Sequence, residues 1–377
     1  MSDSLLVLIV SKETIPNIQF LKWYFMGNTQ KTDLLFISSE GMEGLGKSDA
    51  ILNACQSFSE NFGAHNIIRV NENNLQDISN KLCDCLKYCD YKEYIVNITG
   101  GTKLMSLAVY EYFHDKLNTM IFYQPLNKDL QKIYPEYDEY HVAGHLTIDE
   151  YMKAHGIEYK CDNKCIKSYD YNKDVLNRII INNKDTVQLL LTIQNDRYFI
   201  NKFKHQYVDF PILLDDYIKI SKDSKIDNAS RDKIIDFIKL FDFDVGHLSK
   251  NEFRYITGGW FEEYVFQRIM YSEKLLEDKI ALNVHIEKAA DKNELDVVYL
   301  DKNDRLNVIE CKSFVEGNEA NKILNDALFK LQAIMKSKFG LGAVSYLYTQ
   351  SIITKDSVLK RASDFGIKVI DGDKLND

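Results

Sequence analysis

Residues 293–312 constrain the fold of this chain more than any other segment of its sequence. Two apolar, β-prone runs, 293–300 and 306–312, flank five polar residues that have the composition of a turn. This pattern predicts an antiparallel hairpin. If the two runs pair symmetrically about the middle of the turn, Asp296 and Glu310 lie directly opposite each other, with Cβ atoms roughly 5 Å apart.

The second run of this hairpin carries a Glu-Cys-Lys sequence. Because side chains alternate along a strand, Glu310 and Lys312 should share one face while Cys311 points to the other. Two carboxylates so close are costly to ionise without a cation, and hard oxygen ligands suit Mn²⁺ or Mg²⁺. We therefore predict a metal site formed by Asp296, Glu310 and the backbone carbonyl of Cys311. Lys312 would position or deprotonate a water, or neutralise charge on a phosphate.

A Glu and a Lys two residues apart are also a common accident on solvated strands. Here the strand 306–312 is mostly apolar, and such a strand rarely carries both charges on one face for solvation alone. The matching Asp296 on the first run adds a third group to the pattern. The catalytic interpretation is therefore favoured over a solvated surface.

A third carboxylate is expected from the helix predicted at 258–269, which follows a Gly pair and has apolar residues at helical spacing. Glu262 and Glu263 are adjacent, so they point about 100° apart, and Glu262 is favoured as the one that faces the site. A helix Glu, a strand Asp and a following E-x-K motif resemble the PD-(D/E)xK restriction-endonuclease superfamily over residues 255–377. This resemblance implies Glu262, Asp296, Glu310 and Lys312 as the catalytic residues, although Leu precedes the Asp where many members have Pro.

Further elements complete a small α/β domain after the hairpin. An amphipathic helix is predicted at 321–339, and two strands are predicted at 343–349 and 367–370. Lys330 is one of several lysines on this helix, and such lysines are usually a solvated face.

The first third of the chain alternates short apolar strands, at 4–10, 34–37 and 94–98, with helical patterns between them. Alternation of this kind predicts parallel βαβ units in a doubly wound sheet with both faces covered. Ligands bind such sheets at the carboxyl ends of the strands. The candidate ligand-binding residues at those ends are Ser11, Thr14, Ser38, Ser39, Thr99, Gly100, Gly101, Thr102 and Lys103.

The loop 99–103 opens a helix whose predicted apolar face includes Leu104, Leu107 and Ala108. Backbone amides at a helix start, with glycines and a lysine beside them, can cradle a phosphate. A Gly-Gly turn between a strand and a helix can equally be structural. The spacings of a Walker loop and of the G-x-G-x-x-G fingerprint are absent, which disfavours an ATP- or dinucleotide-dependent enzyme.

The N-I-T-G-G-T-K stretch, the serines at strand ends and the doubly wound pattern resemble the Rossmann-like CARF domain over residues 1–140. CARF domains are sensors of cyclic oligoadenylates in CRISPR-associated proteins, and a CARF domain joined to a PD-(D/E)xK domain is the layout of ancillary type III CRISPR effectors. The resemblance implies a homodimer that binds one cyclic oligoadenylate, cyclic tetra-adenylate, as its allosteric activator. It also implies cleavage of single-stranded DNA or RNA, or nicking of duplex DNA.

The resulting organisation is an α/β chain with a sensor domain at 1–145, a mainly helical connector at 146–250 and a restriction-endonuclease-like domain at 251–377. An alternative is a ligand-sensing regulator in which the connector binds nucleic acid, as a winged helix does, and the last domain is catalytically silent. A silent fold has no reason to retain Asp296, Glu310 and Lys312 together.

Composition sets broader limits. The 377 residues leave room for two or three domains. There is no run of about eighteen apolar residues and no basic start followed by an apolar core, so we expect a cytoplasmic protein without a membrane partner. The net charge of -9 slows encounter with a polyanion, so any nucleic-acid groove must be locally basic.

Overall fold

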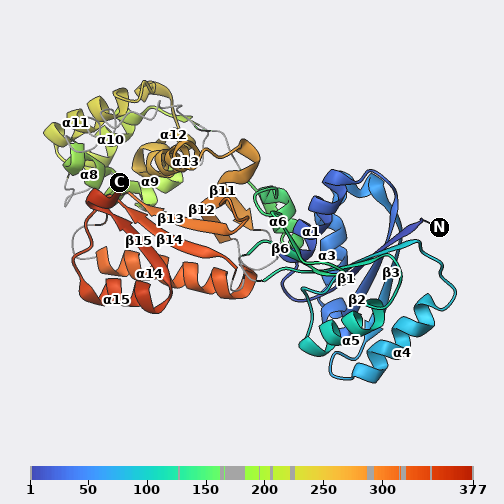
Figure 1. Cartoon of the computed structure of the whole chain (residues 1–377). Coiled ribbons are helices and arrows are strands. Elements are labelled where there is room, and N and C mark those ends of the chain that lie inside the picture. The colour runs from blue at the N-terminus through green and yellow to red at the C-terminus, as the bar shows by residue number, and fades with distance from the viewer. Residues whose placement is uncertain are drawn as a thin grey trace.

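The computed structural model describes residues 2–125, 128–161, 165, 183–194, 196–203, 207–220, 226–286, 293–313, 315, 320–339 and 342–375. Within this part of the chain two α/β domains lie side by side, and a group of helices covers the second one (Figure 1). None of the described helices is both long and apolar enough to cross a bilayer.

The amino-terminal domain is built on a seven-stranded sheet with the order β3-β2-β1-β4-β5-β6-β7. The first five strands in this order are parallel, and β6 and β7 extend the sheet as an antiparallel pair. The strand bounds are β1 Ser4–Ile9, β2 Thr32–Ser39, β3 Phe62–Val70, β4 Glu93–Asn97, β5 Thr119–Tyr123, β6 Leu130–Tyr134 and β7 Asp138–Tyr140. The predicted strands are therefore the three central ones of the five parallel strands, and the doubly wound architecture is confirmed.

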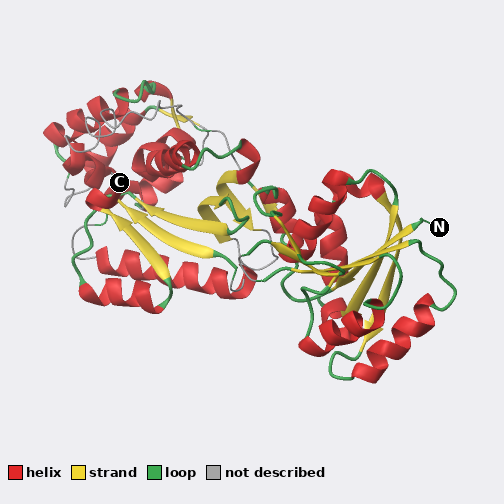
Figure 2. Cartoon of the chain, in the orientation of Figure 1, coloured by secondary structure: helices red, strands yellow, loops and turns green. Residues whose placement is uncertain are grey.

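Helices cover both faces of this sheet (Figure 2). One face packs against α1 (Ile15–Gly27) and α3 (Lys47–Ala54), and the other against α4 (Leu75–Leu86) and α5 (Lys103–Phe113). The short helix α2 (Glu40–Gly44) follows β2.

The prediction for the apolar face of α5 is partly wrong. This helix buries Met105, Ala108 and Val109, whereas Leu104 is 38% exposed and Leu107 is 59% exposed. Thr102 caps the helix, so its first turn begins at residue 103, and the sheet takes up the side chains at 105, 108 and 109. Two leucines beside the loop 99–103 are therefore left on the surface.

The middle of the chain is mainly helical, as predicted. Helix α6 (Ile148–Ala154) packs against α3 and begins with a capping box between Thr147 and Glu150. The described residues of this region also form α8 Lys184–Gln194, α9 Arg197–Lys202, α10 Phe210–Ile220, α11 Asn228–Lys239 and α12 Lys250–Arg254, with short strands β9 Tyr207–Val208 and β10 Leu248–Ser249.

The carboxyl-terminal domain has a six-stranded sheet with the order β15-β14-β13-β12-β11-β8. Strands β11, β12 and β13 are antiparallel, and β13, β14 and β15 are parallel. The strand bounds are β8 Tyr159–Lys160, β11 Ile280–Ile286, β12 Asn293–Leu300, β13 Leu306–Lys312, β14 Val344–Thr349 and β15 Ile367–Asp371, and the helix bounds are α13 Trp260–Ser272, α14 Ala320–Ile334 and α15 Asp356–Asp364. Helix α13 and the middle helices cover one face, and α14 and α15 cover the other.

The two domains share a continuous apolar core. Phe20 and Ile51 of the first domain belong to the same buried cluster as Tyr151 of α6 and Val308 and Leu328 of the second domain. The hairpin of β12 and β13 is therefore packed, through α6, onto the amino-terminal domain and does not hang from a free linker (Figure 1).

Candidate active site and sensor loop

The hairpin forms in the predicted register. Pairing runs from Leu300 opposite Leu306 to Val297 opposite Ile309, and the turn is closed by a bond of 3.0 Å from the Asp301 amide to the Arg305 carbonyl. Asp296 and Glu310 are the next residues on the two strands. The ladder ends just before them, so the two carboxylates lie where the strands begin to separate.

The Asp296 carboxylate accepts a backbone hydrogen bond at the point where the pairing of the two strands ends. The Cys311 amide donates a hydrogen bond of 2.6 Å to Asp296 Oδ2, which fixes the direction of this carboxylate. Asp296 is 6% exposed and Glu310 is 2% exposed. The Cys311 side chain packs on the other face of the sheet with Ile309, as strand alternation predicted. The hairpin therefore holds two buried carboxylates at its open end.

Two lysines bind the two oxygens of Glu310. Lys312 Nζ lies 2.8 Å from Glu310 Oε1 and 3.1 Å from the Cys311 carbonyl oxygen. Lys330 Nζ, from α14, lies 2.6 Å from Glu310 Oε2. The expectation of a solvated surface for Lys330 is therefore wrong. A single sequence held no signal for this contact, because it depends on how α14 packs across the sheet.

Glu262 lies in the first turn of α13 and is close enough to feel these charges. Burial raises the pKa of Glu262, Lys312 lowers it, and Glu294 and Glu310 raise it further. Glu263, its neighbour, is also buried. The influence of Lys312 and Glu310 agrees with the choice of Glu262 as the helix carboxylate that faces the site.

The electrostatics of the site are dominated by buried negative charge. Burial raises the pKa of Asp296 well above its usual range, and the charges of Glu310 and Glu262 raise it further. Burial opposes the charge of Lys312, but Asp296 and Glu310 outweigh it and raise the pKa of Lys312. Three carboxylates face two ammonium groups, so ionising all three leaves an excess of negative charge that a cation would relieve.

The oxygen ligands in this site fit a divalent cation. The described residues contain no group of three or more His, Cys, Asp or Glu side chains arranged to hold a metal ion. The Lys312 ammonium already bridges Glu310 Oε1 and the Cys311 carbonyl, two hard ligands of the kind that Mg²⁺ and Mn²⁺ prefer. Burial raises the pKa of the Cys311 thiol, and this side chain packs on the opposite face of the sheet from Glu310. Only the backbone carbonyl of Cys311 is therefore a candidate metal ligand.

The sensor loop, residues 99–103, connects β4 to α5. A side chain at Gly100 would place its Cβ 2.1 Å from the Ile9 carbonyl oxygen, so glycine is required for this approach to β1. Gly101 has φ +74°, in the left-handed region. Thr102 accepts from the Met105 amide at 3.3 Å and so caps α5, and Lys103 is exposed at its first position. The loop therefore presents amides and one ammonium group at a helix start.

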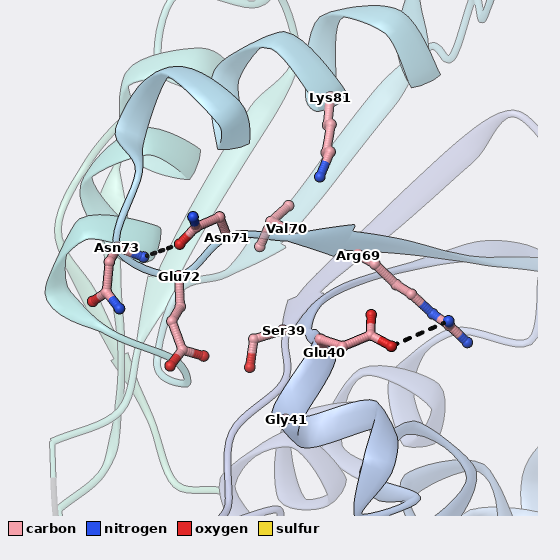
Figure 3. A pocket seen from close by; sticks show the side chains of 9 residues that line it. All are labelled: Ser39, Glu40, Gly41, Arg69, Val70, Asn71, Glu72, Asn73 and Lys81. Carbon is pink, nitrogen blue, oxygen red and sulfur yellow. Dashed lines mark hydrogen bonds and ion pairs between the residues drawn. The ribbon is translucent and has the colours of Figure 1, made fainter.

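A pocket of about 420 Å³ lies next to this loop, at the carboxyl ends of β2 and β3 (Figure 3). Its lining residues are Ser39, Glu40, Gly41, Arg69, Val70, Asn71, Glu72, Asn73 and Lys81. Thr102 Oγ1 donates to the Glu72 carbonyl at 2.9 Å and joins the loop to the pocket wall. The Ser39 hydroxyl is buried and has no hydrogen-bond partner among the described residues.

Two of the predicted ligand-binding residues lie elsewhere. Thr14 is fully buried, and its hydroxyl donates to the Ala154 carbonyl of α6 at 2.6 Å. Ser38 is also fully buried and does not line the pocket, whereas Ser39, at 4% exposed, does. Ser11 is half-buried and donates to the Glu13 carbonyl at 2.7 Å. Thr14 and Ser38 therefore lack the access that a ligand contact requires.

Comparison with protein-family models accounts for nearly all of the chain. Residues 5–151 match the Card1 CARF domain, residues 162–250 the Card1 hinge domain, and residues 249–377 the Card1-like endonuclease domain. The three matches together describe a Card1-like chain with a CARF domain, a hinge domain and an endonuclease domain. The resemblance to a CRISPR-associated CARF-domain nuclease is confirmed, and so is the architecture of sensor, helical hinge and endonuclease-like α/β domain. The domain limits 1–145, 146–250 and 251–377 stay predictions.

Solved structures share this fold. Can2 from Sulfobacillus thermosulfidooxidans, solved in complex with cyclic tetra-adenylate, matches with a TM-score of 0.68 and 19% identity, over 97% of this chain and 95% of that chain. The protein VC1899 from Vibrio cholerae matches with a TM-score of 0.72 and 18% identity, over 99% of this chain and 95% of that chain. A search of curated proteins gave no match. These two structures therefore share the fold of this chain over nearly its full length.

Proposed function

We propose that this protein is a cytoplasmic endonuclease of type III CRISPR antiviral defence, which cyclic tetra-adenylate activates and which uses Mn²⁺ or Mg²⁺ to cleave single-stranded DNA or RNA. The observation that carries the proposal is the set of Asp296, Glu310 and Lys312 at the open end of a hairpin in a Card1-like endonuclease domain. A catalytically silent domain would not need a buried and costly excess of carboxylates.

The chemistry follows from the positions of these groups. Asp296, Glu310 and the Cys311 carbonyl would hold the divalent cation. When bound, such a cation lowers the pKa of a coordinated water and stabilises charge on the phosphate. Lys312 orients the attacking water, and Lys330 holds the second oxygen of Glu310 in place. Glu262 supports the site from α13.

The activator site is proposed at the sensor loop. The amides of Gly100, Gly101 and Thr102 and the ammonium of Lys103 are suited to bind phosphates. Ser11 and Thr99 lie at the same ends of the strands. Ser39 lines the adjoining pocket, and its buried hydroxyl has no hydrogen-bond partner among the described residues, so a base or a ribose that enters the pocket would satisfy it. Cyclic tetra-adenylate is proposed because it is the molecule bound in the Can2 structure.

A homodimer is proposed because a rotationally symmetric ring is best read by two identical loops related by a two-fold axis. Leu104 and Leu107 leave apolar surface exposed on α5 directly beside the sensor loop, where a second copy would cover it. A ligand that contacts both copies buries a larger interface. The larger interface supplies the preference for the active state that switching requires. Moving a switch from about 1% to 99% active takes a preference of roughly 5.5 kcal/mol for the active state.

The test is a cleavage assay with labelled single-stranded RNA, single-stranded DNA and supercoiled plasmid. Each substrate is incubated with Mn²⁺ or Mg²⁺, with and without cyclic tetra-adenylate, and calorimetry measures ligand binding separately. We expect cleavage of a single-stranded substrate that depends on both the metal and the ligand. Cleavage that persists in excess chelator, or at the same rate without ligand, would contradict the proposal. A monomer by light scattering at micromolar concentration would contradict the dimer.

A further inference from the structure

The turn of the catalytic hairpin is anchored in the sensor domain by one buried carboxylate. Asp304 is 2% exposed and accepts hydrogen bonds from the Gly144 amide at 2.8 Å, the Leu146 amide at 3.1 Å and Gln19 Nε2 at 2.9 Å. Gln19 belongs to α1, and Gly144 and Leu146 lie where the chain leaves the sensor domain. The hairpin is therefore held at its closed end by the sensor and at its open end by the active site.

The contact between the turn and the junction is tight. Gly144 has φ +82°, and a Cβ at this position would lie 3.0 Å from the Lys302 carbonyl oxygen of the turn. Lys279, on the other side, places its ammonium 3.4 Å from Asp304 Oδ1. Because close-packed groups of this kind transmit displacement, movement of residues 144–146 or of α1 would be passed to the hairpin.

The side-chain oxygen of Gln19 connects to the sensor loop through Gln124. The side-chain nitrogen Nε2 of Gln124 donates to Gln19 Oε1 at 3.0 Å, and the backbone amide of Gln124 donates to Thr99 Oγ1 at 2.9 Å. Thr99 is the first residue of the sensor loop, and its own amide is held by Asn97 at 3.0 Å. A continuous series of hydrogen bonds thus joins the proposed ligand site to the turn of the catalytic hairpin.

These hydrogen bonds favour a switch between two distinct arrangements over a gradual displacement. Gln19 is 5% exposed, and its amide oxygen accepts from Gln124 while its amide nitrogen donates to Asp304. A buried amide or carboxylate that loses its partner bears the full desolvation penalty, so small shifts at Thr99 or Gln124 favour exchange to another bonded arrangement. Two packed arrangements of this kind are what allosteric coupling needs.

We propose that Gln19, Gln124 and Asp304 couple the sensor loop to the hairpin that carries Asp296 and Glu310, so that a ligand at the loop repositions the active-site carboxylates. This inference rests on the proposed function and names the residues through which its regulation acts. None of the three coupling residues touches the proposed ligand or the scissile phosphate, so they are positioning residues.

The experiment uses full-length Gln124→Leu and Gln19→Leu, singly and combined, with Gln131→Leu as the matched control. Gln131 lies in the same sheet and bonds Glu139 at the surface, outside the coupling residues. Calorimetry measures binding of cyclic tetra-adenylate. Amide hydrogen exchange of residues 293–312, with and without this ligand, measures whether the ligand changes the hairpin. Cleavage assays give the ratio of the stimulated rate to the basal rate. Thermal unfolding shows whether each variant is folded. If Gln124→Leu does not fold, Gln124→Asn, which only shortens the side chain, is used in its place.

In the natural sequence and in the control we expect the ligand to change hairpin exchange and to stimulate cleavage. The Gln124 and Gln19 variants should bind the ligand within about threefold of the natural affinity but lose the exchange response, with stimulation lower by about tenfold or more. The double variant should lose no more than the stronger single one, because both act in one series.

Two results would overturn the inference on its own: variants that keep both the exchange response and the stimulation, or a natural protein that binds the ligand without any change in hairpin exchange. Absence of ligand binding by the natural protein would instead refute the proposed function, and this inference with it. The separate binding measurement distinguishes the two failures.

Discussion

The active site and the sensor loop draw their residues from very different stretches of chain. Asp296, Glu310 and Lys312 come from one hairpin, where strand alternation and a short turn decide which side chains meet. The sensor site gathers residues from three strand ends, and what packs over each end decides whether its side chain is accessible. All three hairpin residues lie together as predicted, whereas Thr14 and Ser38 are buried.

The two sites also differ in their electrostatics. The candidate active site holds buried carboxylates against half-buried amines, where loss of one charge leaves another without a partner. The sensor loop offers backbone amides and an exposed lysine, whose charge is screened by solvent. Substitutions should therefore act strongly at the hairpin and more weakly at the loop.

The largest effect is expected from Glu310→Gln. This change keeps the shape of the side chain but removes the charge that binds both lysines and, in our proposal, the cation. Cleavage should fall on the order of 10³-fold, while thermal unfolding stays cooperative and ligand affinity is unchanged. The measurement is single-turnover cleavage in Mn²⁺ with cyclic tetra-adenylate. Wild-type rates in this variant would remove the hairpin from the catalytic mechanism.

A smaller loss is expected from Lys330→Met, which removes the amine 2.6 Å from Glu310 Oε2 and keeps much of its apolar stem. Groups that orient a catalytic residue typically contribute about 10- to 100-fold. Lys322→Met, on the exposed side of the same helix, is the matched control and should cleave normally. Equal losses in both variants would mean that positive charge on α14, and not the contact with Glu310, matters.

At the sensor loop we expect Lys103→Ala to weaken binding of cyclic tetra-adenylate by about tenfold, or roughly 1.4 kcal/mol, because one charge-assisted contact is lost. Ser38→Ala should leave the affinity within about twofold, since Ser38 is buried. Calorimetry on both variants measures the contrast. Equal loss of affinity in the two would show that burial does not separate ligand-binding residues from structural ones here.

The smallest effect concerns stability and pH. The folded protein raises the pKa of Asp296, mainly through burial, so the stability associated with its protonated form is lost as pH rises from the usual Asp range towards that raised pKa. Asp296→Asn lacks this loss and can still accept from the Cys311 amide. In chelator, its melting temperature should exceed that of the natural protein by about 2–4 °C near neutral pH.

This difference should shrink as the pH falls towards about 4, because there about half of the unfolded chains also carry the proton on Asp296. Thermal unfolding across the range from about pH 4 to about pH 8 measures it, and added Mn²⁺ should stabilise the natural protein but not the variant. A variant that melts lower at every pH would show that the carboxylate is satisfied without a cation.

Several elements could be anticipated because their patterns are local. The apolar runs at β1, β2 and β4 are buried on both faces, so they stand out as continuous hydrophobic strands. Strand β3 was missed because it lies at the edge of its sheet and alternates exposed and buried residues in an irregular way. Strand β11 was missed although it pairs with the catalytic hairpin, since a short apolar run holds no information about its partner.

The sequence by itself determined the hairpin register, and with it the meeting of Asp296, Glu310 and Lys312, because alternation and turn length act over neighbouring residues. Only the tertiary structure decided that Lys330 reaches Glu310, that Leu104 and Leu107 stay exposed, and that Asp304 joins Gln19 across two domains. These contacts depend on how separately formed elements pack. Packing is governed by the fit of whole surfaces, which no short sequence pattern encodes.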